Sequence, residues 1–236
     1  MVLAGGVVPA GAALTTPVCL AKKLKEWGNL RKCQATENGK VLQAKPADPG
    51  KCPVKFDARL ATLNAQATAA AIACRYVDNG DGTVTDYDTG LMWEQKTDDG
   101  SVHDKDNTYS WTLTAGGLPP DGTAFTAFLG TLNNGTSSIP ATATGGCFAG
   151  HCDWRLPVFE ELAGIRDLGA PGCKVPGSGS PCIDQTVFGP TVAGYYWSAT
   201  TLDSNPLNAF FVDFKTGGVT LSKLAALFVR AVRSGL

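Results

Sequence analysis

Apolar residues between positions 56 and 74 recur at alternating spacings of four and three, which predicts one buried stripe along a helix. The stripe consists of Phe56, Leu60, Leu63, Ala67, Ala70 and Cys74. A shorter stripe of Leu20, Leu24 and Trp27 predicts an earlier helix. The stretch 38–50, rich in Gly, Pro and Asp, is expected to connect the two. Residues 17–75 therefore predict an antiparallel helical hairpin.

Such a hairpin places the start of one helix beside the end of the other. This geometry predicts two disulfides, Cys19–Cys74 and Cys33–Cys52, one at each end. Two helices have little core of their own, so these cross-links are physically needed. Each is expected to contribute about 2–4 kcal/mol to stability.

From position 76 the pattern alternates with a period of two and carries turn signals. Asn79-Gly80 and Asp81-Gly82 predict a β-hairpin with strands near 75–78 and 83–87, followed by a strand at 90–95.

Two further helices are expected, at 122–135 and from Pro157 to about Leu168. The second would use Val158, Leu162 and Ile165. Aromatic and β-branched residues predict three closing strands, at 194–200, 209–214 and 227–233. We therefore expect an α+β domain at 76–236, with antiparallel strands, two helices and long loops, after a hairpin at 17–75.

The eight cysteines provide evidence on the cellular compartment in which the protein resides. Their even number indicates disulfides and an oxidising environment, hence a secreted or cell-surface protein. Zinc would usually need repeated Cys-x₂₋₄-Cys pairs or clustered His. Cys147 and Cys152 have the only comparable spacing, and no second pair completes a site. No metal or other cofactor is expected from the cysteines.

Residues 1–16 form a separate apolar segment, and positions 1–15 lack Lys and Arg. One interpretation is the end of a secretory signal, with Ala10-Gly11-Ala12 as its cleavage site. The other is a retained strand that packs into a neighbouring subunit. The segment is too short and Gly-rich to span a bilayer.

Charge is unevenly distributed although the formal net charge is only −1, which gives no indication of nucleic-acid binding. Residues 17–60 carry ten Lys/Arg and four Asp/Glu, whereas residues 78–110 carry nine Asp/Glu and two Lys. The pattern could favour head-to-tail contacts between copies. The simpler interpretation is that the basic and the acidic residues each form a solvent-exposed face.

Six blocks occur in a familiar order: DNGDGTVTDYDTGLMW, GTAFTAFLGTLNNG, CFAGHCDWRLPVFEEL, FGPTVAGYYWSATT, AFFVDFKTGG and FVRAVR. Together they resemble the bacterial Lcl C-terminal domain family, named for a collagen-like adhesin, over residues 75–235. The resemblance implies a variant of the C-type lectin-like fold in secreted or surface proteins. For the adhesin it also implies sulfated-glycan binding and trimerisation, but no glycan-binding motif can be transferred to positions in this chain.

This chain departs from the usual Leu-Pro-Thr-x-x-Glu-Leu of the family. Val158 replaces the Thr that would cap the helix, while Glu161 of the capping box remains. We expect the missing cap to cost about 0.5–2 kcal/mol.

The cysteine-containing block has a structural interpretation. A Cys147–Cys152 disulfide would close a small loop containing His151, and Cys173–Cys182 would pin the loop KVPGSGSP. Trp154 and Leu156 are expected in the core. Asp153 and Arg155 are expected in a buried or half-buried polar network with Glu161 and with Arg230 or Arg233. A ligand-binding network near His151 is the alternative.

Other candidate ligand residues are less specific. Tyr195, Tyr196 and Trp197 could bind glycans or belong to the core. Asp78, Asp81 and Asp86 offer oxygen atoms for calcium, but their spacing is not that of an EF-hand and a hairpin turn explains them more simply. Residues 97–107 form a second acidic loop of equally unspecific character.

Catalysis has little support, because the chain has two His and no Gly-x-Ser-x-Gly ahead of a helix. We expect a non-enzymatic secreted or surface protein that binds glycans and mediates adhesion. The alternative is a self-associating subunit of an extracellular filament or surface assembly, built by head-to-tail contacts through the N-terminal segment and the hairpin.

Overall fold

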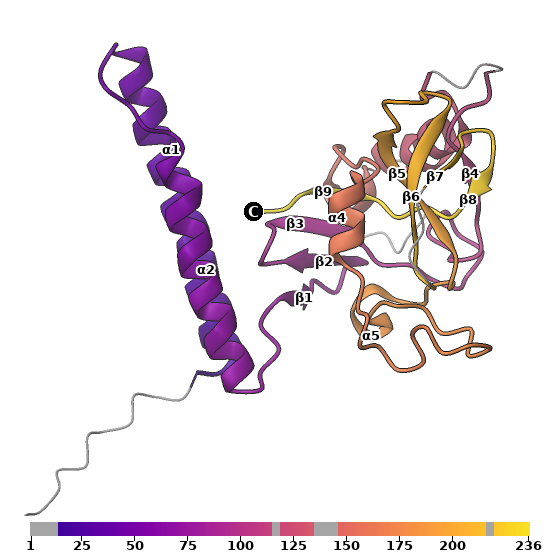
Figure 1. Cartoon of the computed structure of the whole chain (residues 1–236), viewed down its shortest axis with the longest axis horizontal. Helices are drawn as coiled ribbons and strands as arrows, with labels where there is room; N and C mark the ends of the chain where they lie inside the picture. Colours follow the sequence, from indigo (N-terminus) through magenta and orange to yellow (C-terminus); the bar gives the residue numbers. More distant parts are fainter. Residues whose placement is uncertain (1–13, 115–118, 135–145, 216–219) are drawn as a thin grey trace, which may run out of the picture. The chain divides into compact units, whose positions relative to one another are not determined.

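The computed structural model of the chain describes residues 14–114, 119–134, 146–215 and 220–236. It divides into two compact units (Figure 1). Unit 1 contains the residues up to Tyr76 together with Tyr87–Gly90 and Leu236, and unit 2 contains Val77–Asp86 and Leu91–Gly235. Most of the predicted N-terminal segment, residues 1–13, lies outside the described residues.

Unit 1 is built on an antiparallel pair of helices, α1 (Thr16–Leu42) and α2 (Lys51–Ala69), as Figure 1 shows. Disulfides join Cys19 to Cys74 and Cys33 to Cys52, with Cα–Cα distances of 6.1 and 5.8 Å. The face that α2 buries consists of Cys52, Phe56, Leu60, Leu63 and Ala67. The disulfide-linked hairpin predicted from the sequence is confirmed, although Ala70 is exposed at the end of α2.

The predictions for α1 were partly wrong. Leu24 is 50% exposed, whereas Lys23 is only 1% exposed. The buried ammonium group of Lys23 donates hydrogen bonds to the carbonyl of Cys74 and the carboxylate of Asp88. The helix also continues to Leu42, through the start of the predicted connection at 38–50. Helical pairing of Glu37 with Lys40 supports this extra turn.

The segment Tyr87–Gly90 is held in unit 1 by polar and steric contacts. Trp27 Nε1 donates to the Tyr87 carbonyl at 2.9 Å, and Asn64 Nδ2 donates to Asp88 Oδ2 at 3.1 Å. Gly90 has a positive φ of 70°, and a Cβ at this position would lie 2.6 Å from the Trp27 ring. Only glycine therefore fits the close approach here.

Unit 2 is built from short antiparallel strands. One sheet has the order β1 (Tyr76–Asp78), β2 (Thr83–Asp86), β3 (Leu91–Glu94), β9 (Val232–Ser234). A second has the order β5 (Tyr195–Thr201), β6 (Asn208–Asp213), β7 (Thr220–Ser222). The strands β4 (Tyr109–Ser110) and β8 (Ala226–Leu227) form a separate pair.

The predicted strand at 227–233 is not continuous. Its residues divide between β8 and β9, and the side chain of Arg230 between them is completely buried. A buried charged side chain needs hydrogen-bond partners in the interior. The side chains at 227–233 therefore do not alternate between the core and solvent as they would along one strand.

The helices of unit 2 are short. The predicted helix at 122–135 begins as a π-helix, η1 (Ala124–Leu129), and continues as α3 (Gly130–Asn133), while Gly135 lies outside the described residues. The predicted helix at 157–168 is wrong in length, because α4 spans only Phe159–Gly164. Val158 lies before α4 and is exposed, whereas Ile165 lies just after it and is buried. The sequence did not predict α5 (Gln185–Phe188).

Aromatic residues dominate the core of unit 2. Trp111, Phe128, Trp154, Trp197 and Phe211 belong to one buried cluster that joins η1 with strands β5 and β6. The mixed helix and sheet class predicted from the sequence is confirmed. Among the described residues, no helix is long and apolar enough to cross a bilayer.

Candidate functional site

The segment after β4 that carries Cys147 and Cys152 forms a small pinned loop. The two cysteines are bonded, with Cα atoms 5.1 Å apart, and enclose the short 3₁₀ turn η2 (Phe148–Gly150). Trp154 Nε1 donates to the Phe148 carbonyl at 3.0 Å, and the two rings pack with centroids 4.9 Å apart. Asn133 adds hydrogen bonds to the backbone N–H and carbonyl of Trp154. The disulfide and Trp154 therefore anchor this loop to the core.

The charged residues that follow form two separate ion pairs. Arg155 binds Glu161 through two hydrogen bonds of 2.7 Å each. Glu161 also accepts the Val158 N–H at 2.9 Å, which is the surviving half of the capping box. Partial burial opposes ionisation of Glu161, but the bonds from Arg155 and from the Val158 N–H lower its pKa below the usual value.

The second pair joins Asp153 to Arg233. Arg233 Nε lies 2.7 Å from Asp153 Oδ1. The backbones of Arg155 and Val232 pair in both directions at 2.9 Å, which aligns the loop with β9. The hydrogen bond from Arg233 lowers the pKa of Asp153. The expected partners Glu161 and Arg233 are therefore found, and of the two arginines offered it is Arg233 that pairs with Asp153. Asp153 is exposed, however, and the four residues form two separate pairs instead of one buried or half-buried network.

Arg230 is part of a fully enclosed polar cluster. Its guanidinium donates to the carbonyls of Glu94 at 2.7 Å and Phe188 at 2.9 Å, and to Thr191 Oγ1 at 2.9 Å. Lys96 N–H also bonds the Phe188 carbonyl, and a Cβ on Gly189 would lie 2.2 Å from the Lys96 carbonyl. The end of α5 therefore fits tightly over this cluster.

Glu94 is the anion of the same cluster. Its Oε1 lies 3.0 Å from Lys96 Nζ and 2.7 Å from His103 Nδ1, while Oε2 accepts the Ala231 N–H at 2.9 Å. Burial opposes ionisation of Glu94, but Lys96 and His103 together lower its pKa below the usual value. Burial lowers the pKa of Lys96, against the attraction of Glu94.

This carboxylate, imidazole and ammonium are groups that could serve in acid–base chemistry. All three side chains are at most 3% exposed. A group must come within hydrogen-bond distance of a substrate to transfer a proton, and these groups are covered. The arrangement is therefore suited to stabilising the core through buried hydrogen bonds and ion pairs. Sequence reasoning missed it, since Glu94 and Lys96 occupy an otherwise ordinary strand end.

The candidate ligand residues lie in different environments. Trp197 is completely buried, and its Nε1 donates to the Tyr109 carbonyl at 3.0 Å. Tyr195 is 45% exposed, and its ring packs on Phe211 with centroids 4.7 Å apart. His151 is half-buried beside the Cys147–Cys152 disulfide. Tyr196 is also completely buried. Of the three candidate aromatics, Tyr195 is the one that can present its ring to a ligand.

The acidic calcium candidates serve the hairpin turn. Asp78 accepts the Gly80 N–H at 2.8 Å, and Asp81 accepts the Thr83 N–H at 3.1 Å. Asp86 is buried in β2. Among the residues that the structure describes, the carboxylates close enough to share a cation are those of Asp98, Asp104 and Asp106, all in the acidic loop at 97–107.

Those three carboxylates already have partners. Lys105 Nζ lies 3.0 Å from Asp98 and 2.7 Å from Asp106. Asp104 accepts the backbone N–H groups of Asp106 at 2.8 Å and Gly100 at 2.6 Å, which lower its pKa. The loop is therefore well ordered by internal bonds, with Asp98 and Asp106 directed to solvent.

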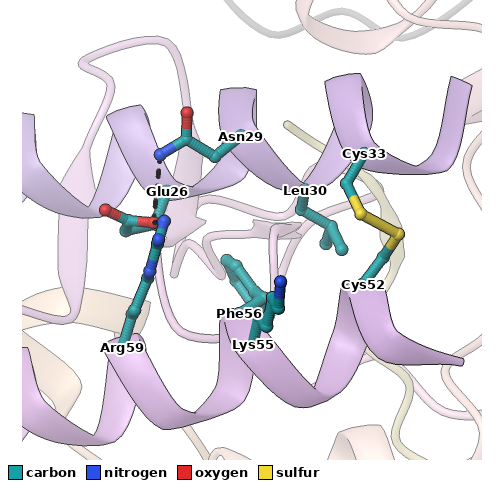
Figure 2. Close-up of a pocket in the computed structure, with 8 residues that line it drawn as sticks. All are labelled: Glu26, Asn29, Leu30, Cys33, Cys52, Lys55, Phe56 and Arg59. Carbon is teal, nitrogen blue, oxygen red and sulfur yellow. Dashed lines mark hydrogen bonds and ion pairs between the residues drawn. A yellow bond between two sulfur atoms is a disulfide. The ribbon is translucent and has the colours of Figure 1, made fainter. Parts of the chain in front are cut away.

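Two adjoining grooves lie along the helical hairpin of unit 1. The first has a volume of about 260 Å³ and is lined by Glu26, Asn29, Leu30, Cys33, Cys52, Lys55, Phe56 and Arg59. Figure 2 shows the Cys33–Cys52 disulfide at one end of this groove and the Glu26–Arg59 pair, 2.8 Å apart, at the other. The second, of about 380 Å³, is lined by Lys22, Lys25, Glu26, Arg59, Thr62, Leu63 and Gln66.

Unit 2 is a disulfide-stabilised α+β domain, and its Cys173–Cys182 bond pins a further loop. Such a domain fits an extracellular location. A model of the Lcl C-terminal domain family matches residues 82–233, which is more than half of the chain, so the chain belongs to this family. Membership indicates a bacterial surface or adhesin-like module. No curated protein and no solved structure matches the chain.

Proposed function

We propose that this chain is a secreted or cell-surface, non-enzymatic bacterial protein. Its family domain would be a lectin-like module, a variant of the C-type lectin-like fold, that binds glycans and mediates adhesion. The observation that carries the proposal is the coincidence of the family match with complete disulfide pairing, since all eight cysteines are bonded. Proteins cross-linked in this way persist in oxidising environments.

The buried state of the acid–base groups supports a non-enzymatic role. Glu94, Lys96 and His103 are enclosed, and the described cysteines are all in disulfides, so neither set offers an accessible reactive group. The exposed ring of Tyr195 is a suitable surface for sugar binding, because sugar rings commonly pack on aromatic faces.

A glycan array that includes neutral, acidic and sulfated polymers tests this proposal. We expect binding to at least one class, and we expect Tyr195→Ala to weaken it about tenfold, the loss of one aromatic contact. Tyr195→Phe is the matched control, since it keeps the ring. Absence of binding to every class contradicts the proposal, and equal binding by both variants removes Tyr195 from the site.

A second candidate function is that of a structural subunit in an extracellular assembly. The separation of charge favours it, because unit 1 is basic and the loop 97–107 of unit 2 is acidic. A head-to-tail contact of this kind generates a ring or an open filament. Sedimentation of the chain with its N-terminal segment present tests this function. A monomer at high concentration contradicts it.

A further inference from the structure

The two grooves of unit 1 carry an excess of positive charge. Lys22 and Lys25 of α1 and Lys55 and Arg59 of α2 line them, and Glu26 is their single acidic lining residue. Glu26 is paired with Arg59. Four cations and one anion give a net lining charge of +3.

The cations are distributed along the hairpin axis. The lining residues of α1 extend from Lys22 to Cys33, eleven positions apart, which corresponds to about 16 Å at 1.5 Å per residue. Because α2 runs antiparallel, Lys55 lies toward the Cys33–Cys52 end and the pair Lys22 and Lys25 toward the other (Figure 2 shows the former end). The groove therefore suits an extended acidic segment better than a single small anion.

These cations are available for a partner. Lys22, Lys25 and Lys55 are exposed, and within the described part of the chain no carboxylate lies within 4 Å of their ammonium groups. By contrast, Lys23 donates a hydrogen bond to the Asp88 carboxylate, and Trp27 donates one to the Tyr87 carbonyl. The residues that hold the 87–90 segment are not among those lining the grooves.

The same chain carries a surface of opposite charge. The loop from Thr97 to Asp106 contains four Asp and one Lys, a net charge of −3, apart from His103. The side chains of Asp98 and Asp106 are 62% and 64% exposed. Asp99 and Asp104 hold the loop backbone through bonds to the N–H groups of Ser101 and Gly100. A loop that is already ordered loses little conformational entropy on binding.

We propose that the two adjoining grooves of unit 1, together called the lysine-lined groove, bind the acidic loop 97–106 of a second copy of this chain. The inference rests on the second proposed function, and it names the two surfaces that meet. The +3 groove and the −3 loop are complementary, and each copy has one of each. The contact is heterologous, so it propagates from copy to copy until a ring closes or a filament forms.

Paired charge reversals in the full-length protein test the proposal. One variant carries Lys25→Glu and Lys55→Glu, and the other carries Asp98→Lys and Asp106→Lys. Sedimentation velocity at low salt should show self-association of the wild type that weakens as salt rises. Each variant alone should lose affinity at least about tenfold, and an equimolar mixture should recover it.

The matched control is Lys32→Glu with Lys45→Glu, which makes the same change in net charge at exposed positions that do not line the grooves. It should retain wild-type association. Because Lys105 contacts both aspartates, Asp98→Asn with Asp106→Asn serves as a milder loop variant. It should weaken association without adding repulsion at Lys105.

The outcomes separate this inference from the assembly function. Association that neither reversal affects contradicts the inference and leaves assembly through another surface. A wild-type chain that stays monomeric contradicts both. A soluble polyanion, dextran sulfate, is the probe for a different occupant. If the wild type binds it without self-associating, and Lys25→Glu with Lys55→Glu abolishes this binding, the groove binds a polyanion and the proposed contact with a second copy is contradicted.

Discussion

Glu94 shows how a charged residue can be a component of a protein core. Burial raises the free energy of its ionised form and, by itself, would raise its pKa. Lys96 at the same strand end, His103 in the acidic loop and the Ala231 N–H before β9 hold it in the charged form. A buried charge with such partners fixes the relative positions of those segments.

Replacing Glu94 should therefore be costly. We expect Glu94→Gln to lower the free energy of unfolding by about 3–5 kcal/mol, because Lys96 would remain buried without its counter-charge. Urea unfolding followed by tryptophan fluorescence measures the change. The double variant Glu94→Gln with Lys96→Met removes both charges and should lose less than the single variant. A single-variant loss below about 1 kcal/mol would show that Lys96 is readily hydrated.

At the scale of the element, the two helices of unit 1 differ in how well their sequences predict them. The apolar stripe of α2 identifies its buried face, because Phe56, Leu60 and Leu63 are all buried, and Phe56 packs on Trp27 of α1. The buried face of α1 includes Lys23 and Glu37, which a hydrophobic pattern cannot reveal. The disulfide pairs were predictable because antiparallel geometry leaves few alternatives once both helices are placed.

The same contrast holds for the candidate site. The Arg155–Glu161 pair was predictable, since the two residues lie on either side of the start of a helix and only six positions apart. The Arg230–Glu94 contact spans 136 positions, and sequence spacing carries no information about it. The aromatic and β-branched residues at 227–233 predict one strand, and the sequence does not reveal that the charged side chain of Arg230 between them is buried.

Glu37 gives the hairpin a predicted dependence on pH. Hydrogen bonds from Lys40, Lys51 and the Asp48 N–H lower its pKa from 4.5 to about 2. A carboxyl group with a lowered pKa stabilises the folded state above its unfolded pKa, and this contribution is lost as pH falls toward the folded value. The thermal midpoint of the helical circular dichroism signal should therefore fall between pH values of about 4.5 and 2.

Other carboxylates also titrate in this range, so the comparison with Glu37→Gln is decisive. This variant should be less stable than the wild type at neutral pH and should show a smaller further loss on acidification. Equal losses in the two proteins would assign the pH dependence to other groups.

At the scale of the whole molecule, the four disulfides divide evenly between the two units. Two staple the hairpin, and two pin loops of the family domain. Each closes a local segment of chain, and no disulfide links one unit to the other. Reduction should thus act on each unit separately, with the greater effect on the hairpin, which has the smaller apolar core.

Complete pairing has a direct measurement. Protein purified from the culture medium or cell surface and unfolded without reductant should take up no alkylating label, whereas reduced protein should take up eight per chain. Intact-mass spectrometry distinguishes the two results. One stoichiometrically labelled cysteine before reduction would contradict the pairing and the proposed non-enzymatic role, because a free thiol is a potential nucleophile.

The distance in sequence between Glu94 and two of its donors has a consequence for the order of folding. Arg230 and Ala231 follow Glu94 by 136 and 137 positions, so the β2–β3 segment leaves the ribosome long before these groups exist. Until they arrive, the carboxylate has Lys96 and His103 as partners but lacks the Ala231 N–H, and the Glu94 carbonyl lacks the Arg230 guanidinium. The enclosed polar cluster is therefore completed only after nearly the whole chain has been synthesised, so this part of the domain closes late in folding.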